Sequence, residues 1–213
     1  PGRVGHKPRE YWQTVTECSG EVLERGKVHP AEIAGIGITN QRETTILWDK
    51  DSGEPVSNAI VWQCRRTAPS CSEIKKTKFA QKIRQKTGLV IDAYFSATKI
   101  QWIFDHLKTI RRAAEKGKLA FGTVDSWLAY NLTGKKLHVT DCSNASRTLL
   151  FDIGKLRWDP ELCGLFGVPP RALPEPRDST ARFGETDLGG LLPRPLPICG
   201  VMGDSQAALF AQR

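Results

Sequence analysis

Apolar residues near the start of the chain recur at helical spacing. Tyr11, Val15, Cys18 and Val22 follow one another at steps of four, three and four. This spacing places them on one face of an amphipathic helix, and Gly26 follows the last apolar position, where helices commonly end. The sequence therefore predicts a helix between Pro8 and the region of Gly26.

The next segments have the pattern of strands. Ile33, Ile36 and Ile38, with small residues between them, predict a buried strand, and residues 44–48 predict another. Residues 49–53, Asp-Lys-Asp-Ser-Gly, are typical of a turn. Because residues 59–62 are again apolar, we expect a β-hairpin formed by residues 44–48 and 59–62.

Helical and extended patterns alternate in the remainder of the chain. A basic helix is expected from Ser72 to Lys86, closed by Gly88, with further helices over residues 96–107 and around 127–132. Residues 169–197 hold more than half of the 13 prolines and predict extended connections with short strands, with a domain edge just beyond them. Alternating strands and helices indicate an α/β fold.

Composition and charge restrict the class of protein. The 213 residues are 39% hydrophobic and 25% charged, as in soluble globular proteins, and no apolar run reaches the ~20 residues needed to span a bilayer. The net charge of +8 concentrates in residues 65–118. Such a patch could attract nucleic acid or another polyanion, but its charges alternate with apolar residues at helical spacing, which favours solvated helix faces. We therefore expect no nucleic-acid partner and no membrane insertion.

The cysteines give no metal signature. The six cysteines form no Cys-x-x-Cys pair and do not cluster with histidine, which argues against a zinc site. The chain starts without Met and without an apolar signal segment, so we expect the sequence to begin inside a longer chain. We expect reduced cysteines and a cytoplasmic location.

A group of polar residues lies between the first two predicted strands. Residues 39–45, Thr-Asn-Gln-Arg-Glu-Thr-Thr, place the cation Arg42 beside the anion Glu43. A carboxylate can accept hydroxyl protons and a guanidinium can donate to hydroxyl oxygens, so this pair could hold a small polyol. The alternative is an ordinary surface ion pair.

Two aromatic residues are further candidates, each with a structural alternative. Ser96 is a natural helix N-cap, and Tyr94 before it could donate its hydroxyl to a ligand or pack against the helix start. Trp62 could form the apolar wall of a pocket or lie in the core, which is the default for a tryptophan.

Near the end of the chain, an apolar run passes through Gly203-Asp204 into a helix-forming segment. A carboxylate fixed at such a turn can act in catalysis, but Asp is also a common helix N-cap. The local sequence leaves both roles open for Asp204.

Six separated runs together resemble one family. Residues 37–45, 58–63, 94–99, 121–128, 144–148 and 203–204 closely resemble the glycerol kinase branch of the FGGY carbohydrate kinases, in order and over essentially the whole chain. The resemblance implies a ribonuclease-H-like N-terminal domain of the actin and hexokinase type. It also implies an enzyme that transfers the γ-phosphoryl group of ATP to glycerol, giving sn-glycerol 3-phosphate.

The resemblance also implies roles for individual residues. Arg42, Glu43 and Tyr94 match positions that bind the hydroxyls of glycerol, and Trp62 matches the aromatic that packs on its carbon chain. Asp204 matches the catalytic base and is a candidate Mg²⁺ ligand. ATP is expected as the phosphoryl donor with Mg²⁺, and the complete enzyme is expected to be a homo-oligomer.

The sequence departs from the family pattern at several places. The Asp-Gln-Gly-Thr-Thr hairpin that contacts phosphate in relatives does not precede Pro1, and a second domain with the adenosine site does not follow Arg213. We therefore expect residues 1–200 to be an incomplete N-terminal domain, residues 201–213 to begin the next, and the fragment alone to be inactive. The alternative function is an inactive remnant or a non-enzymatic polyol-binding fragment.

Two further expectations follow from these departures. Because the first strands would pair with the segment of Ile33, Ile36 and Ile38, the isolated chain should be poorly folded or insoluble. Ser205 stands where the family usually has a Gln that touches glycerol, so affinity should be reduced unless Gln206 substitutes for it.

Overall fold

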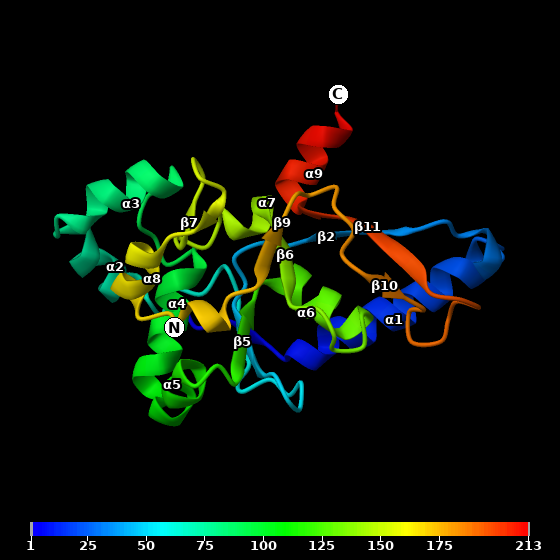
Figure 1. Cartoon of the computed structure of the whole chain (residues 1–213), viewed down its shortest axis with the longest axis horizontal. Coiled ribbons are helices and arrows are strands. Elements are labelled where there is room, and N and C mark those ends of the chain that lie inside the picture. Colours follow the sequence, from blue (N-terminus) through cyan, green and yellow to red (C-terminus); the bar gives the residue numbers. More distant parts are fainter. Residues whose placement is uncertain (1, 213) are drawn as a thin grey trace.

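The largest sheet joins segments from opposite ends of the chain. In the computed structural model, which describes residues 2–212, β2 (Ile36–Asn40) runs parallel to β11 (Leu196–Gly203). The other edge of β11 pairs antiparallel with β10 (Glu185–Thr186), whereas the other edge of β2 has no strand within residues 2–212. Asn40 and Gly203 are paired in register, so the two parallel strands end side by side (Figure 1).

Two helices pack on this sheet. The helix α1 (Pro8–Arg25) begins at a proline, which is tolerated in a first helical turn, and is capped by Gly26, as predicted. With α6 (Val124–Leu132) it contributes to a core that includes Ile38, Ile198 and Trp127. The far end of α1 is less covered, because Val22 is 67% exposed.

The other strands form short pairs: β1 (Gly5–His6) with β4 (Ala59–Ile60), β3 (Ile46–Asp49) with β5 (Leu119–Gly122), β6 (Val139–Asp141) with β9 (Glu175–Arg177), and β7 (Phe151–Asp152) with β8 (Arg157–Trp158). The hairpin predicted for residues 44–48 and 59–62 is therefore only partly correct. Those segments meet antiparallel at a single bridge, Thr45 to Ile60, because β3 pairs along its length with β5 and β4 pairs with β1.

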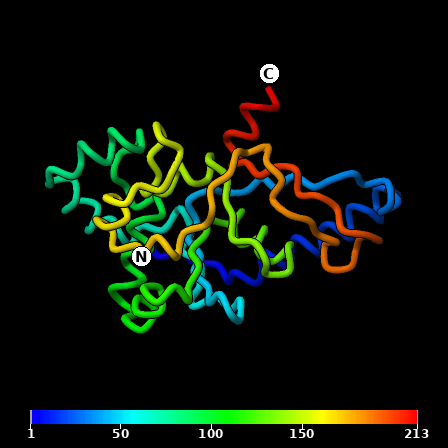
Figure 2. The backbone as a smooth tube through the Cα atoms, in the orientation of Figure 1, coloured from blue at the N-terminus to red at the C-terminus, as the bar shows by residue number. Residues whose placement is uncertain are grey.

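A helical lobe lies beyond these strands, at the opposite end of the elongated molecule from the far end of α1 (Figures 1 and 2). Its helices are α2 (Ala68–Lys75), α3 (Phe79–Thr87), α4 (Ser96–His106), α5 (Lys108–Glu115) and α8 (Pro160–Phe166). They surround a second core that includes Ile83, Ile100 and Phe166, each at most 1% exposed.

The single helix predicted for residues 72–86 is wrong. The structure has α2 and α3 instead, because the hydroxyl of Thr77 accepts a hydrogen bond from the amide of Phe79 at 3.3 Å and redirects the backbone between them. The predicted end of the segment is correct, since Gly88 closes α3 with a left-handed φ of +70°.

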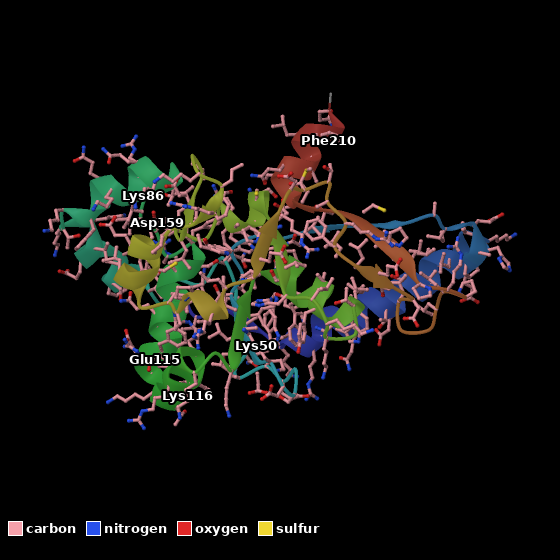
Figure 3. The ribbon with its side chains drawn as sticks, viewed as in Figure 1. Lys50, Lys86, Glu115, Lys116, Asp159 and Phe210 are labelled. Carbon is pink, nitrogen blue, oxygen red and sulfur yellow. The ribbon has the colours of Figure 1, made fainter. Side chains whose placement is uncertain are left out.

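The basic residues of the segment 65–118 lie largely on solvated helix faces, and several are paired. The ammonium of Lys86 lies 2.6 Å from the carboxylate of Asp159 and 3.1 Å from that of Glu161, which joins α3 to α8 (Figure 3). Arg65 pairs with Asp92 at 2.6 Å in the same lobe. Asp159 and Glu161, from outside the segment, thus offset part of its positive charge, and Asp92 from within it offsets more.

The proline-rich segment is extended, as predicted. It contains the short 3₁₀ helix η2 (Pro170–Ala172) together with β9 and β10, whereas η1 (Pro30–Glu32) precedes β2. The strand β11 crosses the expected division between residues 200 and 201 without interruption, and that division stays a prediction. The last helix, α9 (Asp204–Ala211), projects away from the rest of the molecule (Figure 1).

All six cysteines are free, and Cys64, Cys71 and Cys163 are buried. Within residues 2–212, no three His, Cys, Asp or Glu side chains come together in a way that could hold a metal ion. In the same residues, no helix combines the length and apolarity that crossing a bilayer requires.

Candidate functional site

The carboxyl ends of β2 and β11 bring Arg42 and Asp204 together. Arg42 lies just after β2 and Asp204 directly after β11, so the parallel pairing of the strands places them at one edge of the sheet. The guanidinium Nε of Arg42 is 2.9 Å from Oδ1 of Asp204. Its Nη2 donates to Oγ of Ser205 at 2.7 Å, and its Nη1 donates to Oε1 of Gln206 at 2.9 Å. One guanidinium therefore holds the whole first turn of α9.

Gly203 is required here for space. A Cβ at this position would lie 2.4 Å from Cδ of Arg42, a separation that real contacts do not reach. Its φ of −61° is open to any residue, so the close passage of the arginine, and not the backbone conformation, demands glycine.

The structure does not support the capping role considered for Asp204. Gly203 is the N-cap of α9, and Asp204 is its first helical residue. Its Oδ1 accepts from the amide of Ser205 at 2.7 Å, but the side chain is 53% exposed. The carboxylate is thus held at one oxygen by the arginine and remains accessible to a ligand.

Glu43 does not pair with its sequence neighbour Arg42, so the simple surface ion pair considered for these two residues is not what forms. Its carboxylate is 1% exposed, and Oε1 lies 2.7 Å from Nε of Arg147. Burial raises the pKa of Glu43, while the hydrogen bond and charge of Arg147 oppose that rise. Each member of the Arg42-Glu43 pair thus finds its partner in a distant segment.

Trp62 and Tyr94 form an aromatic corner beside these charges. Their ring centroids are 5.5 Å apart in an edge-to-face arrangement, and both side chains are half-buried. Trp62 is therefore not a core residue, in contrast to Trp48 and Trp127, which are at most 2% exposed.

The hydroxyl of Tyr94 lies within the electrostatic reach of the other site residues. Burial raises the pKa of Tyr94, and the charges of Glu43 and Asp204 raise it further, whereas those of Arg42 and Arg147 lower it. These charges come from three separate segments of the chain, around residues 42–43, 147 and 204. Within residues 2–212 the hydroxyl of Tyr94 has no hydrogen-bond partner, which leaves it available to a ligand.

Ser96 has a different function from the one its position suggests. The N-cap of α4 is Phe95, with no side-chain cap. The hydroxyl of Ser96 instead donates to the main-chain oxygen of Glu43 at 3.1 Å. The start of α4 is thereby tied directly to the loop that carries Glu43.

Arg147 was missed as a site residue by reasoning from the sequence. It neutralises Glu43, and its guanidinium lies 6.0 Å from the ring centroid of Tyr94 and 5.0 Å from that of Phe95. The available signal was a single cation inside the run 144–148, next to the apolar residues 149–151. A charged side chain next to a buried apolar segment is usually paired with an opposite charge, so Arg147 could have been expected to have a carboxylate partner.

The segment 141–148 is also joined to both strands of the site. Asn144 exchanges two side-chain hydrogen bonds with Asn40, at 3.0 and 3.2 Å. The short helix α7 (Cys142–Ala145) is capped by the carboxylate of Asp141, and the hydroxyl of Ser143 accepts from the amide of Gly203 at 2.8 Å. This network fixes the end of β2 relative to the end of β11.

Comparison with known proteins places these features in a family. Residues 1–211 match the family described as the FGGY family of carbohydrate kinases, N-terminal domain. The chain is 54% identical to a glycerol kinase of Carboxydothermus hydrogenoformans and 55% identical to one of Symbiobacterium thermophilum, in each case over 212 residues. These alignments cover 100% of this chain but 42% of each relative.

Solved structures agree with this placement. A glycerol kinase of Plasmodium falciparum crystallised with ADP superimposes with a TM-score of 0.92 at 36% identity, covering 100% of this chain and 42% of that one. A gluconate kinase of Lactobacillus acidophilus shares the fold with a TM-score of 0.84 at 22% identity, covering 96% of this chain and 40% of that one. The expected α/β fold is confirmed, and the chain belongs to the FGGY family of carbohydrate kinases, within the N-terminal domain of that family.

Proposed function

We propose that this domain forms the glycerol-binding part of a glycerol kinase, whose complete chain transfers the γ-phosphoryl group of ATP to glycerol and releases sn-glycerol 3-phosphate. The observation that carries the proposal is the convergence of Arg42, Glu43, Tyr94 and Asp204 beside the ring of Trp62. The identity of 54–55% to relatives named glycerol kinase supports the choice of alcohol.

The chemistry of the side chains suits a small polyol. The carboxylate of Glu43 accepts hydrogen bonds from hydroxyls, and the guanidinium of Arg42 donates to hydroxyl oxygens. The free hydroxyl of Tyr94 supplies a third polar contact. The ring of Trp62 covers the carbon chain, which has no polar groups of its own. These polar and charged groups would orient the alcohol, and this orientation is the main task of a phosphoryl-transfer enzyme.

We assign Asp204 as the general base. Its carboxylate takes the proton of the terminal hydroxyl of glycerol as that oxygen forms a bond to the γ-phosphorus, while the bond from this phosphorus to the bridging oxygen of ADP breaks. The guanidinium of Arg42, 2.9 Å away, and the amide of Ser205 hold one carboxylate oxygen of Asp204 in place beside the site.

The charged side chains of the site are compatible with a Mg²⁺ ion that binds together with ATP. Mg²⁺ is usually held by one or two carboxylates together with phosphate oxygens and water, and such an ion neutralises the phosphates during transfer. Asp204 offers one exposed carboxylate of this kind, whereas Glu43 is buried and one of its two oxygens is paired with Arg147. We propose that MgATP is the donor and that Asp204 is the protein group that faces its ion.

The test is glycerol-dependent release of ADP by the complete chain that carries this domain. Asp204→Asn should lower kcat by about 10²–10⁴-fold, the usual contribution of a positioned base, with a smaller change in the KM for glycerol. Asp51→Asn, an exposed turn residue far from the site, is the matched control and should have normal kinetics. A complete chain without glycerol-dependent ADP release would exclude the function, and full activity of Asp204→Asn would exclude the base.

Two accompanying features belong to the same proposal. The free state of all six cysteines supports a cytoplasmic location, which fractionation of the source cells would test. We also propose that the complete enzyme is a homo-oligomer, which light scattering of the purified protein would test.

A further inference from the structure

Lys99, on α4, is completely buried, although it carries an ammonium group. Its side chain is 0% exposed. Its Nζ donates to the main-chain oxygens of Glu43 at 3.4 Å and Phe95 at 3.3 Å, and to that of Tyr94. Within residues 2–212 all of its hydrogen-bond acceptors are main-chain oxygens, and no carboxylate is among them. An isolated buried cation is costly, so these carbonyls must be held firmly in place around it.

Two of the three acceptors belong to residues assigned to glycerol. Glu43 and Tyr94 come from segments about 50 positions apart, and Lys99 contacts the backbone of both. A single ammonium therefore sets the separation between the loop of Glu43 and the start of α4. The side chains of these residues can face the same ligand only while that separation is kept.

The backbone of Glu43 needs such support. Its φ is +61°, and the amide of Thr44 donates to the main-chain oxygen of Arg42 at 2.7 Å across it. This is the pattern of a γ-turn with a positive φ, a rare and strained conformation for a residue with a side chain. It directs the carboxylate of Glu43 toward Arg147 while Arg42 turns toward α9.

The main-chain oxygen of Glu43 is the point where this turn is restrained. It accepts from Oγ of Ser96 at 3.1 Å, from Oγ1 of Thr45 at 3.3 Å and from Nζ of Lys99. Two of these three donors lie on α4. The helix thus holds the strained turn by its carbonyl, while the carboxylate of Glu43 pairs with Arg147.

We propose that Lys99 is a positioning residue for the alcohol: it binds the backbone of Glu43 and Tyr94 and so keeps both side chains directed at glycerol. Lys99 does not contact the substrate or the reacting atoms. Burial lowers the pKa of Lys99 to about 7, against the opposing charges of Glu43, Cys64, Cys71 and Asp92. The ammonium form has three N–H donors, one for each of the three main-chain oxygens that surround it.

The inference rests on the proposed function, because glycerol is the ligand used to detect it. Lys99→Met keeps the length and volume of the side chain but removes every donor. In the complete kinase chain this variant should raise the KM for glycerol by about tenfold or more, while the KM for ATP stays within about twofold. Ser96→Ala, which removes one donor to the same carbonyl, should raise the KM for glycerol by a smaller factor.

A control separates positioning from general loss of packing. Ile83→Ala makes a cavity in the core of the same lobe, on α3, a helix that packs against α2 and β7, and should leave the KM for glycerol unchanged at a comparable loss of stability. An unchanged KM in Lys99→Met, or an equal rise in Ile83→Ala, would overturn the inference. If Lys99→Met does not fold, an unchanged KM in Ser96→Ala overturns it. If the unmodified chain itself fails to bind glycerol, the proposed function fails and not the role of Lys99.

Discussion

Replacing Arg147 by methionine tests how the site tolerates the buried carboxylate of Glu43. The variant removes the 2.7 Å ion pair but keeps a long apolar side chain, so Glu43, at 1% exposure, loses its hydrogen-bonded cation and keeps only the charges of Arg42 and Lys99. An unpaired buried carboxylate avoids the cost of its charge by taking up a proton. At pH 7 that proton must be bound 2.5 pH units above the ordinary pKa of 4.5. At ~1.36 kcal/mol per unit, the cost is about 3 kcal/mol.

The same reasoning gives the pH dependence of the stability of Arg147→Met. In the variant, the folded state holds a proton on Glu43 that the unfolded chain releases above pH 4.5, so the free energy of unfolding falls as pH rises. At pH 5.5 the cost is only ~1.4 kcal/mol, because the proton is then bound a single unit above the ordinary pKa. Lost contacts of the guanidinium with the ring of Phe95 add ~0.5–1 kcal/mol at either pH.

Urea denaturation at pH 7 and pH 5.5 measures both quantities. Arg157→Met, at an exposed position of β8, is the matched control and should change stability by no more than about 0.5 kcal/mol. The double variant Glu43→Gln/Arg147→Met should regain most of the loss at pH 7, because the amide carries no charge. A loss of equal size at both pH values, or a double variant no more stable than Arg147→Met, would refute this account of the pair.

Three further outcomes are expected. Burial lowers the pKa of His138 to about 4, so below pH 6.5 the unfolded chain binds a proton that the folded chain does not. Stability should fall by up to about 3 kcal/mol between pH 6.5 and 4, and His138→Gln should flatten that part of the urea-derived profile. Gly203→Ala should displace Arg42 and weaken glycerol binding by calorimetry, whereas an unchanged affinity would show that the arginine can move aside. Ser205→Gln, which restores the residue usual in the family, should lower the KM for glycerol; an equal or higher KM would mean that Gln206 already substitutes.

The parts of the fold that the sequence predicted are those set by local chemistry. Pro8 and Gly26 bound α1 because proline and glycine act on the backbone next to them, and Gly88 ends α3 for the same reason. The candidate residues Arg42 and Glu43 were identified because they lie in one continuous run. Trp62, Tyr94 and Asp204 were linked to that run by the family resemblance, since their own neighbourhoods left other roles open.

The parts that the sequence did not predict depend on distant partners. Arg42 pairs with Asp204, and Glu43 pairs with Arg147, across 162 and 104 positions of the chain. Spacing and periodicity contain no information about such contacts. Ser96 shows the same limit, because its hydroxyl binds the carbonyl of Glu43 in preference to capping its own helix. The break at Thr77 was missed because the helical spacing of apolar residues continues through it, although the backbone there forms a turn in which the Thr77 hydroxyl accepts from the amide of Phe79.

The parallel pairing of β2 with β11 has a consequence for the order of events during synthesis. Chains are made at about 5–20 residues per second, so roughly 8–30 s separate the appearance of Arg42 from that of Asp204 at the ribosome. During that interval the loop after β2 is already made, but the strand that completes the sheet and the carboxylate that faces the arginine are not. A ligand that needs both Arg42 and Asp204 therefore cannot stabilise the early nascent chain, because these two residues meet only when β11 pairs with β2.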